Sequence, residues 1–149
     1  MSLKLRKPLA LLAIAVFTGC NGPLPFLSGS ALSGGIVPTP KTWALDEDFG
    51  ICQLETNPDA PYSVNIAYTQ INGQLYLNAG DTETQWVKNM DANPNVRLRI
   101  SDAIYELRAE RIRDPQEVAA FGKAWTDHSM FHRDPVALEQ VWIYRLVGR

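Results

Sequence analysis

The chain has 149 residues, of which 46% are hydrophobic and 20% are charged, and its formal net charge is −2 at pH 7. This length and this apolar share are those of one ordinary globular domain with its own core. The acidic balance excludes the basic footprint that nucleic-acid binding requires, so we expect no nucleic acid among the partners.

The first 19 residues have the composition of a secretory signal. Three basic residues and no acid precede an apolar run, residues 9–17, which is shorter than the about 20 apolar residues that span a bilayer. The pattern therefore predicts a signal peptide over residues 1–19. Its removal leaves 11 basic against 16 acidic residues, a formal net charge of −5.

The sequence FTGC at residues 17–20 resembles a bacterial lipobox, with Phe17 at a position where such motifs usually carry Leu. The resemblance implies cleavage before Cys20, diacylation of its thiol, and membrane lipid as a partner. Asn21 stands where Asp would favour the inner membrane, which implies a lipid-anchored envelope protein on the periplasmic side, at the outer membrane rather than the inner. A plain signal peptide whose cleavage site precedes a cysteine is the alternative.

Residues 20–41 are rich in Gly, Pro and Ser and carry no charge before Lys41. This composition predicts a flexible tether between the lipid and a folded domain over residues 42–149. The apolar side chains of Leu27, Leu32 and Ile36 could still pack on that domain.

The predicted domain opens with strands. Residues 49–56 form a compact apolar run that the prolines of NPDAP end, which predicts a buried strand. With Cys20 acylated, Cys52 in this run is unpaired and is expected to be a buried small hydrophobe, with a catalytic thiol as the alternative. Two alternating runs, 62–70 and 75–79, flank Asn-Gly, which predicts a hairpin with a type I′ turn.

The next stretch, GDTETQWVKNMDANPNVRLRI, predicts a helix, a stop and a strand. Thr82 with Gln85 three residues later forms a capping box, and Asn93-Pro94 ends the helix. The alternation that follows predicts a hairpin over residues 96–113. The apolar stripe of the helix is Trp86, Val87 and Met90.

A second helix is predicted from Asp114 as N-cap, Pro115 at the first helical position and Glu117 two residues later. RDP at 133–135 predicts a short helical turn, and residues 141–147 predict the last strand. The elements together predict a mainly β fold with two or three short helices: a six-stranded antiparallel barrel with a helix at each opening.

The order of these elements over residues 54–113 resembles the split β-barrel superfamily, which includes pyridoxamine-phosphate oxidase-like flavoproteins and the deazaflavin-dependent nitroreductase family. The flavin branch usually places Lys where this chain has Trp86. The deazaflavin branch has a motif of Trp, then Asn-Leu, then Asn- or His-Pro before a hydrophobic strand. The residues of this chain that are similar to it are Trp86, Asn89, Met90, Asn93, Pro94 and Val96.

The resemblance implies a six-stranded split barrel, normally a homodimer, with FMN or a deazaflavin in the groove between subunits. The implied activity is hydride transfer between this cofactor and a small oxidised substrate, a quinone or a nitro compound. No catalytic residue and no metal site are assigned. The implied phosphate position is at a strand end and a helix start, where free N–H groups suit an anion. The implied cofactor-binding residues are Tyr68, Asn78, Gly80, Thr82, Thr84, Gln85 and Trp86.

One departure bears on the cofactor. The deazaflavin branch has a basic, glycine-rich turn after a strand that ends in Thr, whereas Thr56 is followed here by NPDAPYS, without Gly, Arg or Lys. Each lost charge-assisted contact to a phosphate is worth about 1.5–3 kcal/mol, and Asp81 and Glu83 add negative charge. The alternative function is therefore a non-catalytic split barrel that binds a small ligand or a partner protein.

Two further side-chain clusters are better explained by structure than by function. His128 and His132 would share one helix face, but no third metal ligand is evident, so an ordinary helix end is favoured over a metal site. Several arginines on the 96–113 hairpin alternate with Glu106 and Glu110, which favours cross-strand ion pairs over an anion-binding face.

Overall fold

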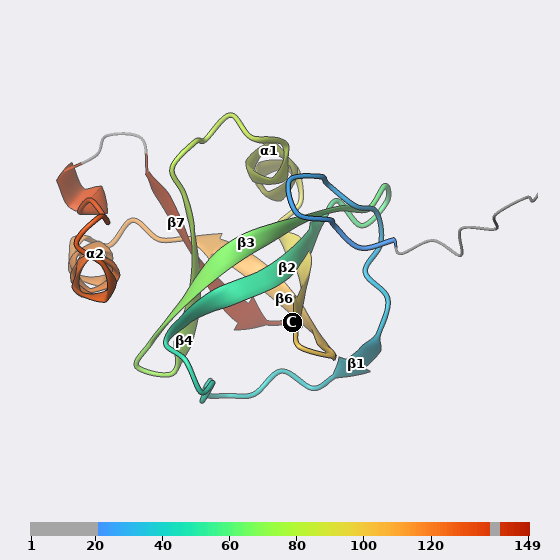
Figure 1. Ribbon diagram of the computed structural model, residues 1–149, viewed down its shortest axis with the longest axis horizontal. Coiled ribbons are helices and arrows are strands. Elements are labelled where there is room, and N and C mark those ends of the chain that lie inside the picture. The colour runs from blue at the N-terminus through green and yellow to red at the C-terminus, as the bar shows by residue number, and fades with distance from the viewer. Residues whose placement is uncertain (1–20, 138–140) are drawn as a thin grey trace, which may run out of the picture.

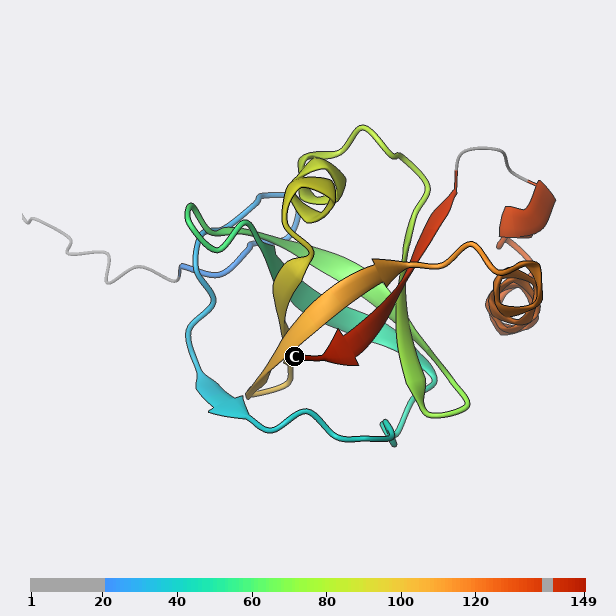
Figure 2. The same cartoon turned by 180° about the vertical axis from the view of Figure 1, so that it is seen from behind.

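A computed structural model describes residues 21–137 and 141–149 (Figures 1 and 2). The predicted signal peptide and Cys20 lie outside the described residues. None of the described helices has the length and apolar character to cross a membrane. In chain order the elements are β1 (Gly35–Val37), β2 (Phe49–Thr56), β3 (Tyr62–Ile71), β4 (Gln74–Ala79), α1 (Gln85–Ala92), β5 (Asn95–Ile100), β6 (Ala103–Arg111), α2 (Pro115–His128), the 3-10 helix η1 (Pro135–Ala137) and β7 (Trp142–Gly148).

Six strands close into an antiparallel barrel. Their order is β6-β5-β2-β3-β4-β7, and β7 pairs back with β6 to complete the ring. The seventh strand, β1, pairs in parallel with the start of β6 and lies outside the ring. The predicted mainly β class and the six-stranded antiparallel barrel are confirmed.

The hairpin predictions are confirmed as well. Asn72 and Gly73 join β3 to β4 with φ angles of 49° and 75°, the positive values that a type I′ turn requires. Ser101 takes a positive φ of 53° in the turn between β5 and β6. These turns fix the register in which alternate side chains point into the barrel.

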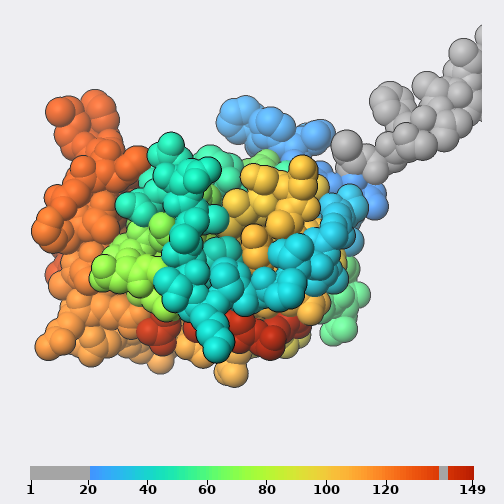
Figure 3. Space-filling model, turned by 90° about the horizontal axis from the view of Figure 1, so that it is seen from below, coloured from blue at the N-terminus to red at the C-terminus, as the bar shows by residue number. Residues whose placement is uncertain are grey.

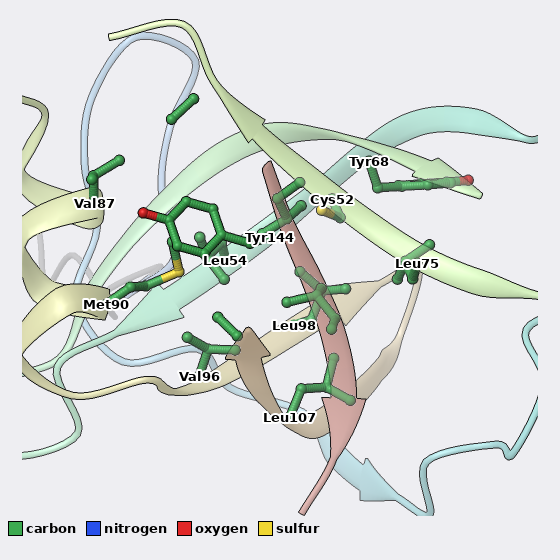
Figure 4. Close-up of a cluster of buried hydrophobic side chains, with 14 of the residues drawn as sticks. Cys52, Leu54, Tyr68, Leu75, Val87, Met90, Val96, Leu98, Leu107 and Tyr144 are labelled. Carbon is green, nitrogen blue, oxygen red and sulfur yellow. The ribbon is translucent and has the colours of Figure 1, made fainter. Parts of the chain in front are cut away.

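The barrel interior is apolar, and helix α1 covers one of its openings (Figures 1 and 4). Val87 and Met90 of α1 join the interior cluster. Helix α2 was predicted to cover the other opening. It packs instead on the outer wall of the barrel, where Phe121 joins a second cluster with Tyr76 of β4 and Ile143 of β7. The interior residues that are at most 2% exposed include Leu54, Leu75, Leu77, Val96, Leu98, Leu107 and Leu146.

The two helices begin differently. Asp114 caps α2 as predicted, because its carboxylate accepts from the N–H groups of Gln116 and Glu117 at 3.0 and 2.9 Å. The capping box predicted for α1 is wrong. The helix starts at Gln85, after Thr84, whose hydroxyl makes no cap bond within the described chain and instead donates to the Asp81 carbonyl at 3.2 Å.

Residues 21–41, the described part of the predicted tether, contact the barrel at a few points, while Leu27 and Ile36 stay 64% and 58% exposed. Leu32 is only 4% exposed, and its N–H donates to the Glu55 carboxylate at 2.5 Å. Gly29 exchanges backbone hydrogen bonds with Ser63 of β3. Composition indicated flexibility, but a buried leucine and a buried carboxylate hold this segment in place. Contacts of Leu32, Gly29 and β1 thus attach this segment to the barrel.

Buried polar groups in the core have contrasting partners. Cys52 is 3% exposed, as predicted, and burial raises its pKa to about 12. Tyr144 is 2% exposed, and its hydroxyl has no hydrogen-bond partner among the described residues. The hydroxyl of Tyr76 instead donates to Glu117 Oε1 at 3.0 Å. Burial raises the pKa of both tyrosines to about 12, and for Tyr76 the bond to Glu117 adds to this.

These tyrosines give a matched pair of substitutions. Tyr144→Phe is expected to raise the free energy of unfolding by about 1 kcal/mol, because it removes an unpaired buried hydroxyl, and Tyr76→Phe to lower it by about 1 kcal/mol. Because the folded-state pKa values exceed the unfolded one, wild-type stability should fall as pH rises from about 10 to about 12. Either substitution should lessen that fall. Urea unfolding at pH 7 and pH 11 measures both effects, and changes of the same sign at pH 7 would contradict the assignment.

Candidate functional site

The predicted cofactor residues do not form one cluster. Tyr68 is 6% exposed and lies in the barrel interior, and Figure 4 shows it on the opposite side of the core cluster from Val87 and Met90 of α1. Its hydroxyl donates to the Glu47 carbonyl at 3.4 Å. Tyr68 is therefore a core residue, and the structure does not place its side chain with the polar side chains at the start of α1.

The start of α1 instead begins a polar network that reaches into the barrel. Gln85 Nε2 donates to Asn89 Oδ1 at 2.8 Å, and Asn89 Nδ2 donates to Thr56 Oγ1 at 2.9 Å. Thr56 in turn donates to the carbonyl of Tyr62 at 3.2 Å. The network connects α1 to the β2–β3 turn, where the deazaflavin branch has its basic, glycine-rich turn. Thr82 is half-buried beside it.

Trp86 packs against the barrel core. Its ring meets that of Tyr144 edge-on, with centroids 6.4 Å apart, and the side chain is half-buried. This contact explains why a large aromatic residue stands at this position of the motif. Packing accounts for Trp86 without a cofactor.

Charges at this end of the barrel are already paired. Lys88 of α1 binds Glu83, which lies just before the helix, at 3.1 Å. A cavity of about 240 Å³ beside Thr56 has two arginines, but Arg97 binds Glu55 and Arg149 binds Glu106 at 3.0 Å. A phosphate here would therefore meet no free cation among the described residues. Arg97 forms a cross-strand ion pair, but with Glu55 of β2, whereas Glu106 and Glu110 of the predicted hairpin bind Arg149 and Arg145.

Two predicted residues, Asn78 and Gly80, lie in a different groove. This groove has a volume of about 190 Å³ and lies between the end of β4 and the chain that follows α2. A Cβ atom added to Gly80 would meet no described atom within 4 Å, so the strand end is open. The opposite wall consists of Trp125, Phe131, His132 and Arg133, with Pro135 and Val141 at its edges.

The groove wall is held by stacking. His132 lies on Trp125 with ring centroids 3.8 Å apart and an angle of 7° between the planes. Its Nδ1 is 2.7 Å from the Trp125 carbonyl, which can only accept, so Nδ1 carries the proton and Nε2 is left for a ligand. Gly122 allows this fold-back, since a Cβ there would lie 2.6 Å from Asp134 Oδ1.

Arg133 gives the groove its charge. It is exposed and forms no ion pair with a described residue. A groove with an aromatic wall, an imidazole nitrogen and a guanidinium suits a flat ligand that carries an anionic group.

The histidine pair is part of an aromatic stack. Helix α2 ends at His128, so His132 lies beyond it, and the two rings are 5.7 Å apart. His128 stacks on Phe49 at 4.1 Å. No group of three metal-ligating side chains occurs in residues 21–137 and 141–149.

No family model matches the chain, and no curated protein matches it. Solved structures do match. A conserved hypothetical protein from Mycobacterium tuberculosis is 20% identical, with a TM-score of 0.53 over 66% of this chain and 72% of that one. A candidate pyridoxamine 5'-phosphate oxidase from Listeria innocua is 16% identical, with a TM-score of 0.53 over 65% and 82%. An F420 reductase is 20% identical, with a TM-score of 0.46 over 66% and 86%.

The chain has the split β-barrel fold. The resemblance inferred from the order of its elements is confirmed at this level. Asn78 is predicted to lie in one site with the start of the first helix. In the structure Asn78 lines a groove whose far wall comes from residues 125–135. Sequence reasoning missed that wall because a helical stripe and an RDP turn carry no sign of which strand end they face. The run Phe131, His132 and Arg133, an arginine beside two aromatic residues, was the available signal.

Proposed function

We propose that this split barrel is a lipid-anchored oxidoreductase of the cell envelope that binds FMN or a deazaflavin and acts on a small oxidised substrate, a quinone or a nitro compound. The observation that carries the proposal is the groove in which Arg133, His132 and Trp125 face Asn78 and Gly80. The fold adds support, since the Listeria innocua neighbour bears the name of an oxidase acting on a phosphorylated ring compound.

The groove fits the anionic end of such a cofactor. Arg133 would bind a phosphate, and the open strand end at Gly80 leaves room for it. The volume of about 190 Å³ is below the about 300–1,000 Å³ of complete small-molecule sites. A second copy of the chain would complete the site, as the expected homodimer requires.

The start of α1 does not fit the phosphate. Asp81 and Glu83 are exposed there, and Lys88 is bound to Glu83. The cofactor is therefore held at Arg133 and not at the turn after Thr56. When bound, a flavin or deazaflavin supplies hydride transfer. The chain's own part is to bind the phosphate through Arg133 and to offer His132 Nε2 as a hydrogen-bonding group at the groove.

Titration with FMN, riboflavin and a deazaflavin tests the proposal. Full-length protein is expected to bind FMN more tightly than riboflavin, which lacks the phosphate. Arg133→Gln should weaken FMN binding about tenfold and leave riboflavin binding unchanged, because one charge-assisted contact is lost. Lys41→Gln removes an equal charge far from the groove and should change neither. Binding is measured by the absorption spectrum of the chromophore.

Loss of the FMN preference in the Lys41 variant, or its persistence in Arg133→Gln, would contradict the placement of the phosphate. A strictly monomeric protein in light scattering would contradict the shared groove. Fatty-acid labelling that is insensitive to Cys20→Ala would contradict the anchor.

The second candidate is a non-catalytic split barrel that binds a small ligand or a partner protein. The paired arginines beside Thr56 and the core positions of Tyr68 and Trp86 favour it. Absence of binding for FMN and the deazaflavin, in a folded protein, would leave this candidate in place of the oxidoreductase.

A further inference from the structure

The chain turns sharply at residues 24–27, shortly after the predicted lipid anchor. The N–H of Leu27 donates to the Leu24 carbonyl at 3.1 Å, which closes a β-turn with Pro25 and Phe26 at its centre. Phe26 has a φ of 69°, a value for which this turn position usually carries glycine. The 24–27 turn thus holds a phenylalanine in a conformation that bulky side chains rarely adopt.

The apolar side chains of the 24–27 turn point into solvent. Leu24 and Leu27 are 54% and 64% exposed, and Phe26 is fully exposed. No charged residue occurs in the sequence between Lys7 and Lys41. In Figure 3 the blue N-terminal segment stands out from the edge of the molecule. The turn is therefore an uncharged apolar tip without a partner among the described residues.

The turn is fastened to the barrel on its inner side. Asn65 Nδ2 donates to the Leu24 carbonyl at 3.0 Å, and Gln53 Nε2 donates to the Pro23 carbonyl at 3.4 Å. Gly29, just after the turn, exchanges backbone hydrogen bonds with β3. These carbonyls are already satisfied, and proline has no N–H, so moving the tip into an apolar medium leaves few backbone groups without a partner.

The predicted anchor limits where this turn can lie. Cys20 precedes Leu24 by four residues. An extended chain spans at most about 3.6 Å per residue, so at most about 14 Å separates their Cα atoms. The headgroup layer on each side of a bilayer is about 5–8 Å thick. With the acyl chains of Cys20 in the hydrocarbon, the 24–27 turn stays within reach of the bilayer surface.

We infer that the 24–27 turn inserts its three exposed apolar side chains into the surface of a phospholipid bilayer, an inference that rests on the lipid anchor proposed above. Burial of these side chains favours insertion, and a turn without basic residues does not require anionic lipid. Figures 1 and 2 place this segment and helix α2 toward opposite ends of the longest axis. The inserted turn therefore orients the barrel with the Arg133 groove away from the lipid.

Spin labels on the acylated protein in phosphatidylcholine vesicles test the insertion. One label is attached at Leu27→Cys and, in a second variant, at Met130→Cys, a site that is 90% exposed after α2. Cys52 is buried and acylation blocks Cys20, so the label reacts with the introduced cysteine. The ratio of label collisions with oxygen to those with a water-soluble nickel chelate is expected to be about tenfold higher at Leu27, because oxygen concentrates in the apolar layer that an inserted side chain enters.

Phe26→Gly separates insertion from folding. Glycine suits the positive φ and the exposed ring packs little, so the thermal midpoint should stay unchanged or rise. The collision ratio at Leu27 should nevertheless fall about threefold, because the largest inserted side chain is lost. Val136→Ala removes apolar surface from an exposed site after α2 and should change neither quantity.

The outcomes distinguish the turn from the anchor. Equal collision ratios at Leu27 and Met130 in acylated protein would overturn the insertion and leave the anchor in place, with a partner protein as the occupant of the tip. Protein without fatty acid on Cys20 would overturn both. The flavin titration is unaffected by either result, because the Arg133 groove shares no residue with the 24–27 turn.

Discussion

Phe121→Ala is expected to lower the free energy of unfolding by about 3–5 kcal/mol, the usual cost of emptying a buried phenylalanine site. Phe121 is 1% exposed and joins α2 to the outer wall of the barrel. Its ring lies 5.9 Å from that of Tyr76 and 6.0 Å from that of Trp125. Urea unfolding followed by circular dichroism measures the loss.

The position of Phe121 adds a functional consequence. The groove at Arg133 has one wall on α2 and directly after it, so a loosened α2 should weaken the proposed FMN binding. Val136→Ala, at a site that is 59% exposed, should change stability by less than about 0.5 kcal/mol. A loss below about 1 kcal/mol for Phe121→Ala would mean that α2 is not held by this contact.

Local patterns predicted the barrel well. Three correctly predicted features each have a short-range cause. The Asn72-Gly73 turn needs positive φ, the strand at 49–56 follows from its apolar run, and the cap at Asp114 from a side chain that accepts backbone N–H groups. Such causes need no knowledge of the distant chain. The predicted hairpins and the barrel class follow from them.

Long-range contacts decided what the sequence did not predict. The tether rich in Gly and Ser packs because Glu55, 23 residues away, accepts the N–H of Leu32. The capping box at Thr82 failed because Asp81 takes the N–H of Glu83, which delays the helix. The site prediction depended on α1, whereas the groove at Arg133 depends on how the chain after α2 returns to Gly122, a contact that no local pattern predicts.

The Glu55–Arg97 pair leads to the second large effect. Glu55 is 5% exposed and accepts from Arg97 Nε at 2.7 Å, from its terminal nitrogen at 2.5 Å, and from the N–H of Leu32 at 2.5 Å. Arg97 also donates to the Leu32 carbonyl at 3.2 Å. One carboxylate thus fastens the N-terminal segment to β2 and β5.

Glu55→Gln is expected to lower the free energy of unfolding by about 2–4 kcal/mol. Breaking a buried pair usually costs about 3–5 kcal/mol, and Arg97 recovers part of this because its side chain is 24% exposed to water. The same change should release residues 29–37, so the amides of Leu32 and β1 should exchange hydrogen faster while those of β2 remain protected. Hydrogen exchange with mass spectrometry resolves the two segments.

Two comparisons isolate the buried charge as the cause. Glu106→Gln removes a partner of Arg149 whose side chain is 45% exposed, and it should cost less than about 1 kcal/mol. Glu55→Gln combined with Arg97→Met removes both charges, and it should recover part of the loss because no unpaired ion remains buried. Suppose that Glu55→Gln and Glu106→Gln lowered the free energy of unfolding by the same small amount, and that the amide of Leu32 exchanged hydrogen as in the wild type. The Leu32 side chain and the pairing of β1 would then hold the N-terminal segment without the carboxylate.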